Sequence, residues 1–249
     1  MSEPRHKHHL LLPEVGGQGQ KAIAAAHVLV IGAGGLGCPI LSYLAAAGIG
    51  TLTICDGDKV ELSNLQRQTL YTEGDIGKPK PKAAAQRLKA INGDITINDV
   101  HRFFSEENAQ DLLSGVDLVI EGVDRIAARH VINKACLKAG KPLLSAAASR
   151  FEGQVALFRP GQVGHPCYAC LVPPNADEDG LCDRDGVLGP VVGVVGSLAA
   201  SEALKVICDI KPTLEKTILI AHLKAGTIRR TAMERDPCCA VCGEQTPPE

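Results

Sequence analysis

The feature that most constrains this chain is a short apolar segment that runs directly into a glycine-rich turn. Residues 27–31 read HVLVI, a β-branched apolar run typical of a buried strand, and residues 32–37 read GAGGLG. A helix is predicted to follow at 38–47. Glycines between a strand and a helix let a phosphate approach the backbone, and the helix N-terminus favours its negative charge. The sequence therefore predicts a nucleotide-binding turn with four candidate contacts: Gly32, Gly34, Gly35 and Gly37.

Strands and helices continue to alternate after this turn. Strands are predicted near 51–55, 95–100, 117–121 and 142–146, and helices near 81–91, 105–113 and 128–139. This order predicts an α/β fold, Rossmann-like and doubly wound around a mostly parallel sheet. Beyond residue 146, strands at 154–158, 217–221 and 227–231 predict an antiparallel C-terminal extension of the sheet, and a further helix is predicted from about Ser197.

The length of 249 residues permits one large domain. We expect a single domain over 1–249, divided into an N-terminal arm at 1–26, a nucleotide-binding half at 27–146 and a second half at 147–249.

Charge and hydropathy narrow the class of partner. A net charge of -2 and a pI near 6.4 argue against a broad electrostatic grip on nucleic acid. The N-terminus lacks the continuous apolar core of a signal peptide, and no charge-free apolar run reaches the roughly 18 residues that a membrane helix needs. We therefore expect a soluble, cytoplasmic protein that binds neither nucleic acid nor membrane.

The residues after the second predicted strand favour ATP over a dinucleotide. Asp56 is placed to accept hydrogen bonds from ribose hydroxyls, which by itself would also suit an NAD-dependent oxidoreductase. The stretch 56–82 then adds a density of donors that a neutral nicotinamide pocket does not need. Its polar and charged candidates are Asp58, Asn64, Arg67, Lys78, Lys80 and Lys82.

The spacing of the cysteines predicts a metal. Ten cysteines are present, and two CxxC pairs stand out, Cys167 with Cys170 and Cys239 with Cys242. Four thiolates in a reducing compartment typically form a closed, tetrahedral Zn²⁺ site, which here would fix the C-terminal tail to the domain. Independent buried or redox-active cysteines are the alternative.

Several motifs together resemble the MoeB/ThiF family (HesA/MoeB/ThiF), bacterial relatives of ubiquitin-activating enzymes. They are GAGGLG, DGDKVELSNLQRQTLY, GKPK, PCYAC, GVLGPVVGVVGSLAASEALK and the final CxxCG. The resemblance implies an adenylyltransferase that uses ATP to activate the C-terminal glycine of a ubiquitin-like sulfur carrier ending in Gly-Gly, before thiocarboxylate formation. A carrier of the molybdopterin-synthase small-subunit type is the first expectation, and a thiamin-pathway carrier is the alternative.

The resemblance also implies residue roles. Arg67 and Lys80 match the family's phosphate-contacting cations, Asn64 their accompanying asparagine and Asp56 the ribose-binding acid. Asp124 matches the aspartate used near Mg²⁺.

A lone cysteine lies in the polar stretch 172–185. By resemblance, this Cys182 corresponds to a cysteine that can join covalently to the carrier, although Asp183 and Asp185 beside it oppose thiolate formation.

The sequence departs from the family pattern in two places. The family's Arg-Tyr-x-Arg start reads Arg5-His6-Lys7-His8 here, so that His8 stands where an arginine would reach a phosphate across a dimer interface, unless Arg5 or Lys7 substitutes. Arg125 stands where an asparagine usually follows the Mg²⁺-site aspartate. A non-catalytic carrier-binding module is therefore a third possible function.

The resemblance further implies a homodimer and places carrier binding and zinc in the half 147–249. The apolar, glycine-rich run 189–196 either admits the carrier's extended tail or packs tightly as helix. No rhodanese-like domain follows residue 249, so we expect a separate sulfur-donor protein.

Overall fold

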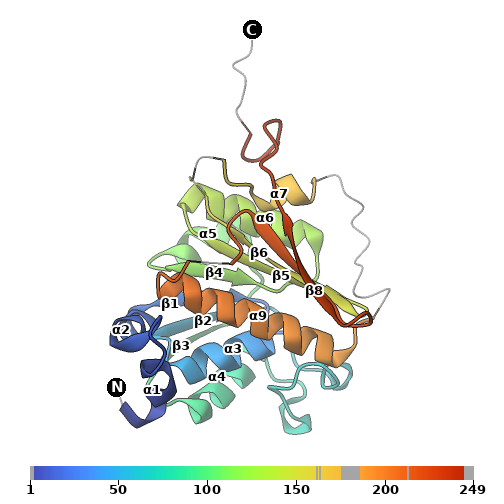
Figure 1. The fold of residues 1–249 in the computed structure, drawn as a ribbon. Coiled ribbons are helices and arrows are strands. Elements are labelled where there is room, and N and C mark those ends of the chain that lie inside the picture. Colours follow the sequence, from blue (N-terminus) through green and yellow to red (C-terminus); the bar gives the residue numbers. More distant parts are fainter. Residues whose placement is uncertain (1–2, 161, 163, 175–185, 212, 244–249) are drawn as a thin grey trace.

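A computed structural model describes residues 3–160, 162, 164–174, 186–211 and 213–243. Its described strands form one eight-stranded sheet in the order β3-β2-β1-β4-β5-β6-β7-β8 (Figure 1). The strands are β1 (His27–Ile31), β2 (Thr51–Cys55), β3 (Thr96–Val100), β4 (Leu118–Glu121), β5 (Leu143–Ser149), β6 (Glu152–Phe158), β7 (Thr217–His222) and β8 (Thr227–Ala232). Strands β1 to β5 pair in parallel, and β5 to β8 pair antiparallel. The predicted mostly parallel sheet with an antiparallel extension is confirmed.

Helices cover both faces of the parallel part of the sheet (Figure 1). Helices α2 (Gly16–Ala25), α3 (Gly37–Ala47), α4 (Lys80–Ile91) and α9 (Gly189–Ile207) pack on one face, and α5 (Glu106–Leu113), α6 (Ile126–Ala139) and α7 (Tyr168–Leu171) on the other. In β1, Val28 and Val30 point into the first core, whereas Leu29 and Ile31 point into the second. A strand buried on both sides must be apolar at every position, which is why residues 27–31 read as a continuous apolar run.

The start of α9 is the main correction to the predicted elements. The sequence predicted a helix from about Ser197, but the helix begins at Gly189, and Pro190 occupies its first turn. Gly196 allows this helix to approach α3, because a Cβ there would lie 2.4 Å from Cγ of Pro39. The sequence left two interpretations of 189–196 open, and Gly196 fits the one of tight helix packing.

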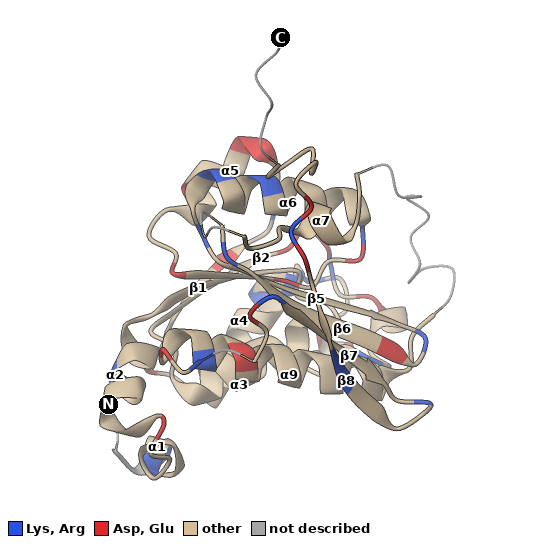
Figure 2. Ribbon diagram, turned by 45° about the horizontal axis from the view of Figure 1, so that its top comes forward, with Lys and Arg blue, Asp and Glu red and all other residues tan. Residues whose placement is uncertain are grey.

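Helix α9 is also the one helix in the described residues that is long and apolar enough to cross a membrane. It packs against α3, β5 and β6, and Val191, Val195 and Ala199 are buried there. Figure 2 shows it mostly in tan, the colour of uncharged residues. Its apolar character is thus used in the core of the domain.

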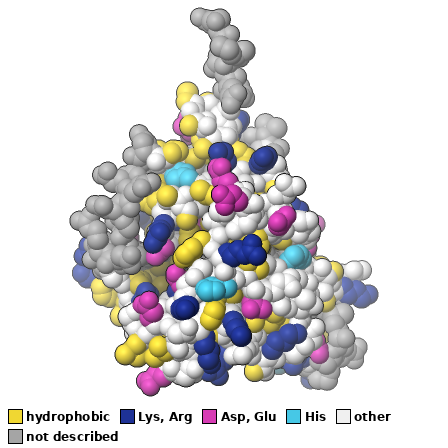
Figure 3. Space-filling model, turned by 180° about the vertical axis from the view of Figure 1, so that it is seen from behind, with side chains coloured by type: hydrophobic (Ala, Val, Ile, Leu, Met, Phe, Trp, Pro, Cys, Tyr) yellow, Lys and Arg dark blue, Asp and Glu magenta, His cyan; other side chains and the backbone are white. Residues whose placement is uncertain are grey.

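The N-terminal arm forms two helices, α1 (Glu3–Leu10) and α2, which pack on each other. Arg5 donates to the backbone carbonyl of Ile91 at 2.9 Å, and His8 lies beside a small pocket with Tyr43. Within this chain, neither residue lines the main cavity. On the face shown in Figure 3, acidic and basic side chains are interspersed.

Candidate active site

A cavity of about 590 Å³ lies at the carboxyl ends of the parallel strands. The turn after β1, Asp56 after β2, the loop after β3 and residues 122–125 after β4 all line it, and Gly186, Val187 and Val192 close it from the second half of the chain. This edge is where open α/β sheets bind their ligands.

The glycine turn is held rigidly at the floor of this cavity. Gly32 has a φ of +92°, which favours glycine. One oxygen of Asp56 accepts a hydrogen bond from the N–H of Ala33 at 2.7 Å, and the hydroxyl of Tyr71 donates to the carbonyl of the same residue at 2.7 Å. The turn is therefore fixed in shape before any ligand arrives, which lowers the entropic cost of binding.

The predicted glycines divide into two groups. Gly32, Gly34 and Gly35 line the cavity, but Gly37 does not. A Cβ at Gly37 would lie 2.1 Å from the carbonyl oxygen of Gly32, so this glycine lets α3 start close to the turn. In the described structure, a glycine is therefore needed at this position of the motif for close packing.

Two of the four predicted cations, Arg67 and Lys80, meet at the cavity. Lys80 is buried at the start of α4, and its ammonium lies 2.9 Å from a carboxylate oxygen of the half-exposed Asp58. Arg67 lines the same cavity and donates to the carbonyl of Ser63 at 3.2 Å. An ammonium has three protons and a guanidinium five, so both retain donors for a ligand. Lys82 is exposed and Lys78 is bonded to Asp75, and neither lines the cavity.

Asn64 and Asp124 also line the cavity. The side-chain oxygen of Asn64 accepts from the N–H of Glu61 at 3.3 Å, which shapes the turn that carries Arg67. Asp124 is exposed in the loop after β4, next to Arg125. A carboxylate in this position is open to a hard cation.

The structure contains a buried ion pair behind this loop that the sequence analysis did not predict. Glu121, at the end of β4, is 1% exposed and lies 3.1 Å from Arg129 of α6. Its carboxylate also accepts from the hydroxyl of Ser145 and from the N–H of Val123 at 3.2 Å. Arg129 further donates to the carbonyls of Val123 and, at 3.0 Å, of Ala146. The pair therefore fixes the backbone immediately before Asp124.

Burial changes the acidity of Glu121. Burial raises the pKa of Glu121, and the positive charge of Arg129 opposes this rise. An acidic residue at the end of an otherwise apolar strand, DLVIE, was the sequence signal that could have revealed the pair.

Removing Arg129 should therefore destabilise the domain strongly. We expect Arg129→Met to lower the free energy of unfolding by roughly 3–5 kcal/mol, because it leaves the buried carboxylate of Glu121 without its charge partner. Urea denaturation measures the change. The double variant Glu121→Gln with Arg129→Met should recover part of the loss.

Lys134→Met is the matched control on the same helix. Lys134 also pairs with a carboxylate at 3.1 Å, that of Glu106, but both side chains are exposed. A surface pair is worth about 1 kcal/mol or less. If both variants lost the same free energy of unfolding, the buried pair would stabilise the domain no more than the exposed pair does.

The four predicted zinc ligands lie together. The sulfur atoms of Cys167, Cys170, Cys239 and Cys242 all lie within 4.8 Å of one another. The distance from Cys167 to Cys239 is 3.8 Å, and that from Cys170 to Cys242 is 3.4 Å. Tetrahedral Zn²⁺ with bonds of about 2.3 Å requires sulfur separations of about 3.8 Å, so the donors and their geometry fit this ion.

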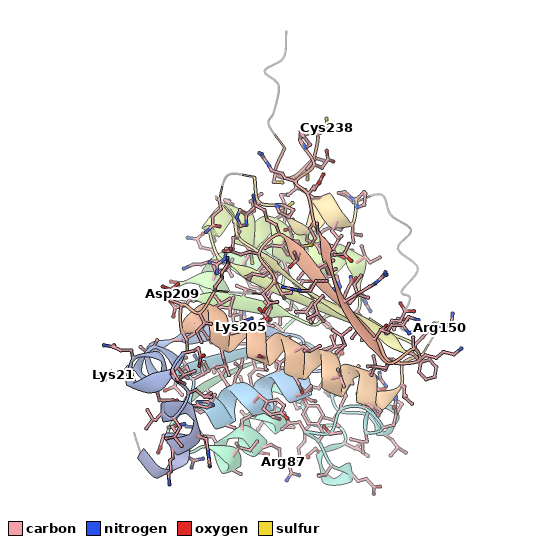
Figure 4. The ribbon with its side chains drawn as sticks, in the orientation of Figure 1. Lys21, Arg87, Arg150, Lys205, Asp209 and Cys238 are labelled. Atoms are coloured by element: carbon pink, nitrogen blue, oxygen red, sulfur yellow. The ribbon has the colours of Figure 1, made fainter. Side chains whose placement is uncertain are left out.

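Cys238 and Cys182 lie outside this cluster. Cys238 is exposed and points outward (Figure 4), and the four-sulfur cluster contains Cys239, the neighbour that the spacing selected. Cys182 falls outside the described residues, and its predicted role stays a prediction.

A family model places this fold and cavity among known proteins. The model of the ThiF family matches residues 6–241. The chain belongs to the ThiF family. The resemblance seen in the sequence is thereby confirmed, and the oxidoreductase reading, which the glycine turn and Asp56 alone would permit, loses its support.

Individual members of the ThiF family are similar over nearly the whole chain. The sulfur carrier protein adenylyltransferase of Thermus thermophilus is 40% identical and covers 97% of this chain and 91% of its own length. The adenylyltransferase and sulfurtransferase MOCS3 of Sus scrofa is 42% identical over 97% of this chain, which spans 53% of that relative. E. coli MccB, crystallised with MccA-N7isoASN, has a TM-score of 0.84 at 25% identity, over 98% of this chain and 75% of that one.

Proposed function

We propose that this ThiF-family chain uses ATP to adenylate the C-terminal glycine of a ubiquitin-like sulfur carrier ending in Gly-Gly. The observation that carries the proposal is the meeting of Arg67, Lys80, the rigid glycine turn and Asp56 at one cavity. A nicotinamide needs no such pair of cations, whereas a triphosphate does. The 40% identity to a sulfur carrier protein adenylyltransferase supports the same activity.

The reaction makes an electrophile from a carboxylate. The carrier's terminal carboxylate attacks the α-phosphorus of ATP, the bond to the β-phosphate oxygen breaks, and pyrophosphate leaves with the electron pair. Phosphoryl chemistry of this kind depends on positioning and on stabilising the charge of the phosphate oxygens. We assign this role to Arg67 and Lys80, with Gly32, Gly34 and Gly35 contacting phosphate through the backbone and Asp56 contacting the ribose.

Asp124 would hold Mg²⁺ at the cavity, helped by Asp58, which is half exposed next to Lys80. The ion would neutralise phosphate charge when bound. Glu121 and Arg129 fix the backbone before Asp124 and so set where this carboxylate points.

We assign carrier binding and the structural Zn²⁺ site to the half 147–249. Gly186, Val187 and Val192 of this half border the cavity, so that a carrier seated there can direct its tail to the phosphates. We further propose a cytoplasmic homodimer that works with a separate sulfur-donor protein, and a covalent link to the carrier at Cys182. A thiamin-pathway carrier stays the alternative to one of the molybdopterin-synthase type.

Carrier-dependent exchange of labelled pyrophosphate into ATP tests the proposal. An adenylyltransferase catalyses this exchange, whereas an oxidoreductase or a non-catalytic carrier-binding module does not. Mass spectrometry of candidate carriers incubated with the protein and Mg-ATP then identifies the substrate by the added AMP. Absence of both exchange and adduct, with every Gly-Gly carrier tried, would overturn the proposal.

A further inference from the structure

Phe103 is a large apolar side chain that the proposed chemistry leaves without a role. It lies in the loop between β3 and α5, it is 66% exposed, and it lines the cavity. A single exposed aromatic residue is common on protein surfaces and signifies nothing alone. The position of this ring does carry information, because the surrounding structure is built to hold it.

The ring packs directly on Gly57. A Cβ at Gly57 would lie 2.6, 2.6 and 2.7 Å from three consecutive ring carbons, Cδ2, Cε2 and Cγ of Phe103. An edge-on approach would bring one of these carbons far closer than the other two, so the ring presents a face to the glycine. Gly57 has no positive φ that would call for glycine. Room for the ring therefore explains why a side chain is missing there.

Three hydrogen bonds hold the loop that carries the ring. The Nε2 of His101 donates to the carbonyl of Gly57 at 2.9 Å, and the thiol of Cys55 donates to the carbonyl of Arg102 at 3.2 Å. The side-chain amide of Asn108 donates to the carbonyl of Phe103 itself at 2.8 Å. These bonds tie the loop to β2 on one side and to α5 on the other, so the ring is positioned before a ligand binds.

The ring of Phe103 lies where the base of a bound nucleotide is expected. In the proposed function, on which this inference rests, the phosphates lie at the glycine turn and the ribose at Asp56. The base and the phosphates are attached to the ribose on opposite sides of its ring oxygen. The base therefore extends away from the glycine turn. Gly57 directly follows Asp56, and β3 neighbours β2, which brings Phe103 to that side of the cavity.

We propose that Phe103 is the residue on which the adenine of ATP stacks, and that Gly57 is required to seat its ring. An aromatic face stacks on a base with a gain of about 1–3 kcal/mol, which corresponds to roughly 5- to 150-fold in affinity. Val123 and Ile132 offer a different, aliphatic wall of the same cavity. ATP titrations of Phe103 and Val123 variants separate the two locations.

Isothermal titration of ATP and of tripolyphosphate, each without carrier, tests the assignment. We expect Phe103→Ala to bind ATP at least about fivefold more weakly than wild type. Phe103→Trp, which keeps the aromatic face, should bind ATP within about twofold of wild type. Binding of tripolyphosphate should be the same in all three, because it has no base. Tyr43→Ala, which removes another exposed aromatic ring away from the cavity, is the matched control and should not change either ligand.

Gly57→Ala tests the seat of the ring independently. Its Cβ would displace the ring of Phe103, so we expect it to weaken ATP binding in the wild-type background and to add little in the Phe103→Ala background. Equal losses in the two backgrounds would overturn the assignment, as would wild-type ATP affinity in Phe103→Ala.

The two proposals fail in different ways. If the wild-type protein bound no ATP, both the proposed function and this assignment would be wrong. If Phe103→Ala bound ATP normally while wild type catalysed pyrophosphate exchange, only the assignment would be wrong. If Val123→Ala selectively lost ATP affinity and Phe103→Ala kept it, the base would lie on the aliphatic wall instead.

Discussion

Lys80→Ala should lower kcat/KM for carrier-dependent pyrophosphate exchange about 1000-fold. The ammonium of Lys80 is buried at the cavity, where it can stabilise charge on the phosphate oxygens far better than a cation in water. Removing one such donor typically costs about 100- to 1000-fold, and a cation at a transferring phosphoryl group contributes about 1000-fold or more. Exchange kinetics with purified carrier measure the effect.

Lys82→Ala is the matched control for this variant. Lys82 lies two residues further along α4, but it is exposed and does not line the cavity. Its removal should leave the exchange rate within about twofold of wild type. Losing the partner of Asp58 should cost little stability, because that carboxylate is half exposed. A folded Lys80→Ala protein with full exchange activity would contradict the assignment of this lysine.

Cys239→Ser should abolish stoichiometric Zn²⁺ binding and destabilise the C-terminal half. The cluster joins Cys167 and Cys239, which are 72 residues apart, so an ion there would cross-link the residues after β8 to the segment that carries α7. A structural zinc site contributes folding free energy directly. A loss of about 5 kcal/mol would lower the Tm by roughly 10–20 °C in a domain of this size. Metal analysis and calorimetry give the two readouts.

Cys238→Ser is the control for the zinc prediction. Cys238 is the immediate neighbour of Cys239, yet it is exposed and outside the four-sulfur cluster. It should keep one Zn²⁺ per chain and the wild-type Tm. If Cys238→Ser and Cys239→Ser both bound the ion, or both lost it, the ligand set would be wrong. Removing the ion from wild type with a chelator should reproduce the Tm of Cys239→Ser.

Local sequence patterns selected most of the predicted residues that line the cavity. The strand, glycine turn and helix at 27–47 are contiguous, so the geometry that they adopt depends on neighbouring residues and can be predicted from them. Arg67 and Lys80 follow in the next stretch, and the paired cysteines have a spacing that only a few structures use. Arg67 and Lys80 meet at the cavity and the four predicted cysteines form one cluster, whereas Lys78 and Lys82 lie elsewhere.

Long-range packing supplied what local patterns missed. Whether Gly189 begins a helix depends on the partner helix against which Gly196 packs, and glycine propensity alone favours a loop. Glu121 pairs with Arg129, which a separate helix brings to the end of β4, and burial raises the pKa of Glu121 against the opposing charge of Arg129.

Short motifs with fixed spacing were enough to predict the fold class and the family, and to select the glycine turn and the four cysteines that the structure brings together. Three features appear only in the folded chain: Gly37 lets α3 pack close to the turn, a buried ion pair holds the loop before Asp124, and Phe103 lies on Gly57 beside the cavity. These contacts join residues from different strands and helices, and burial sets their energies. A linear pattern contains neither the contact nor the burial.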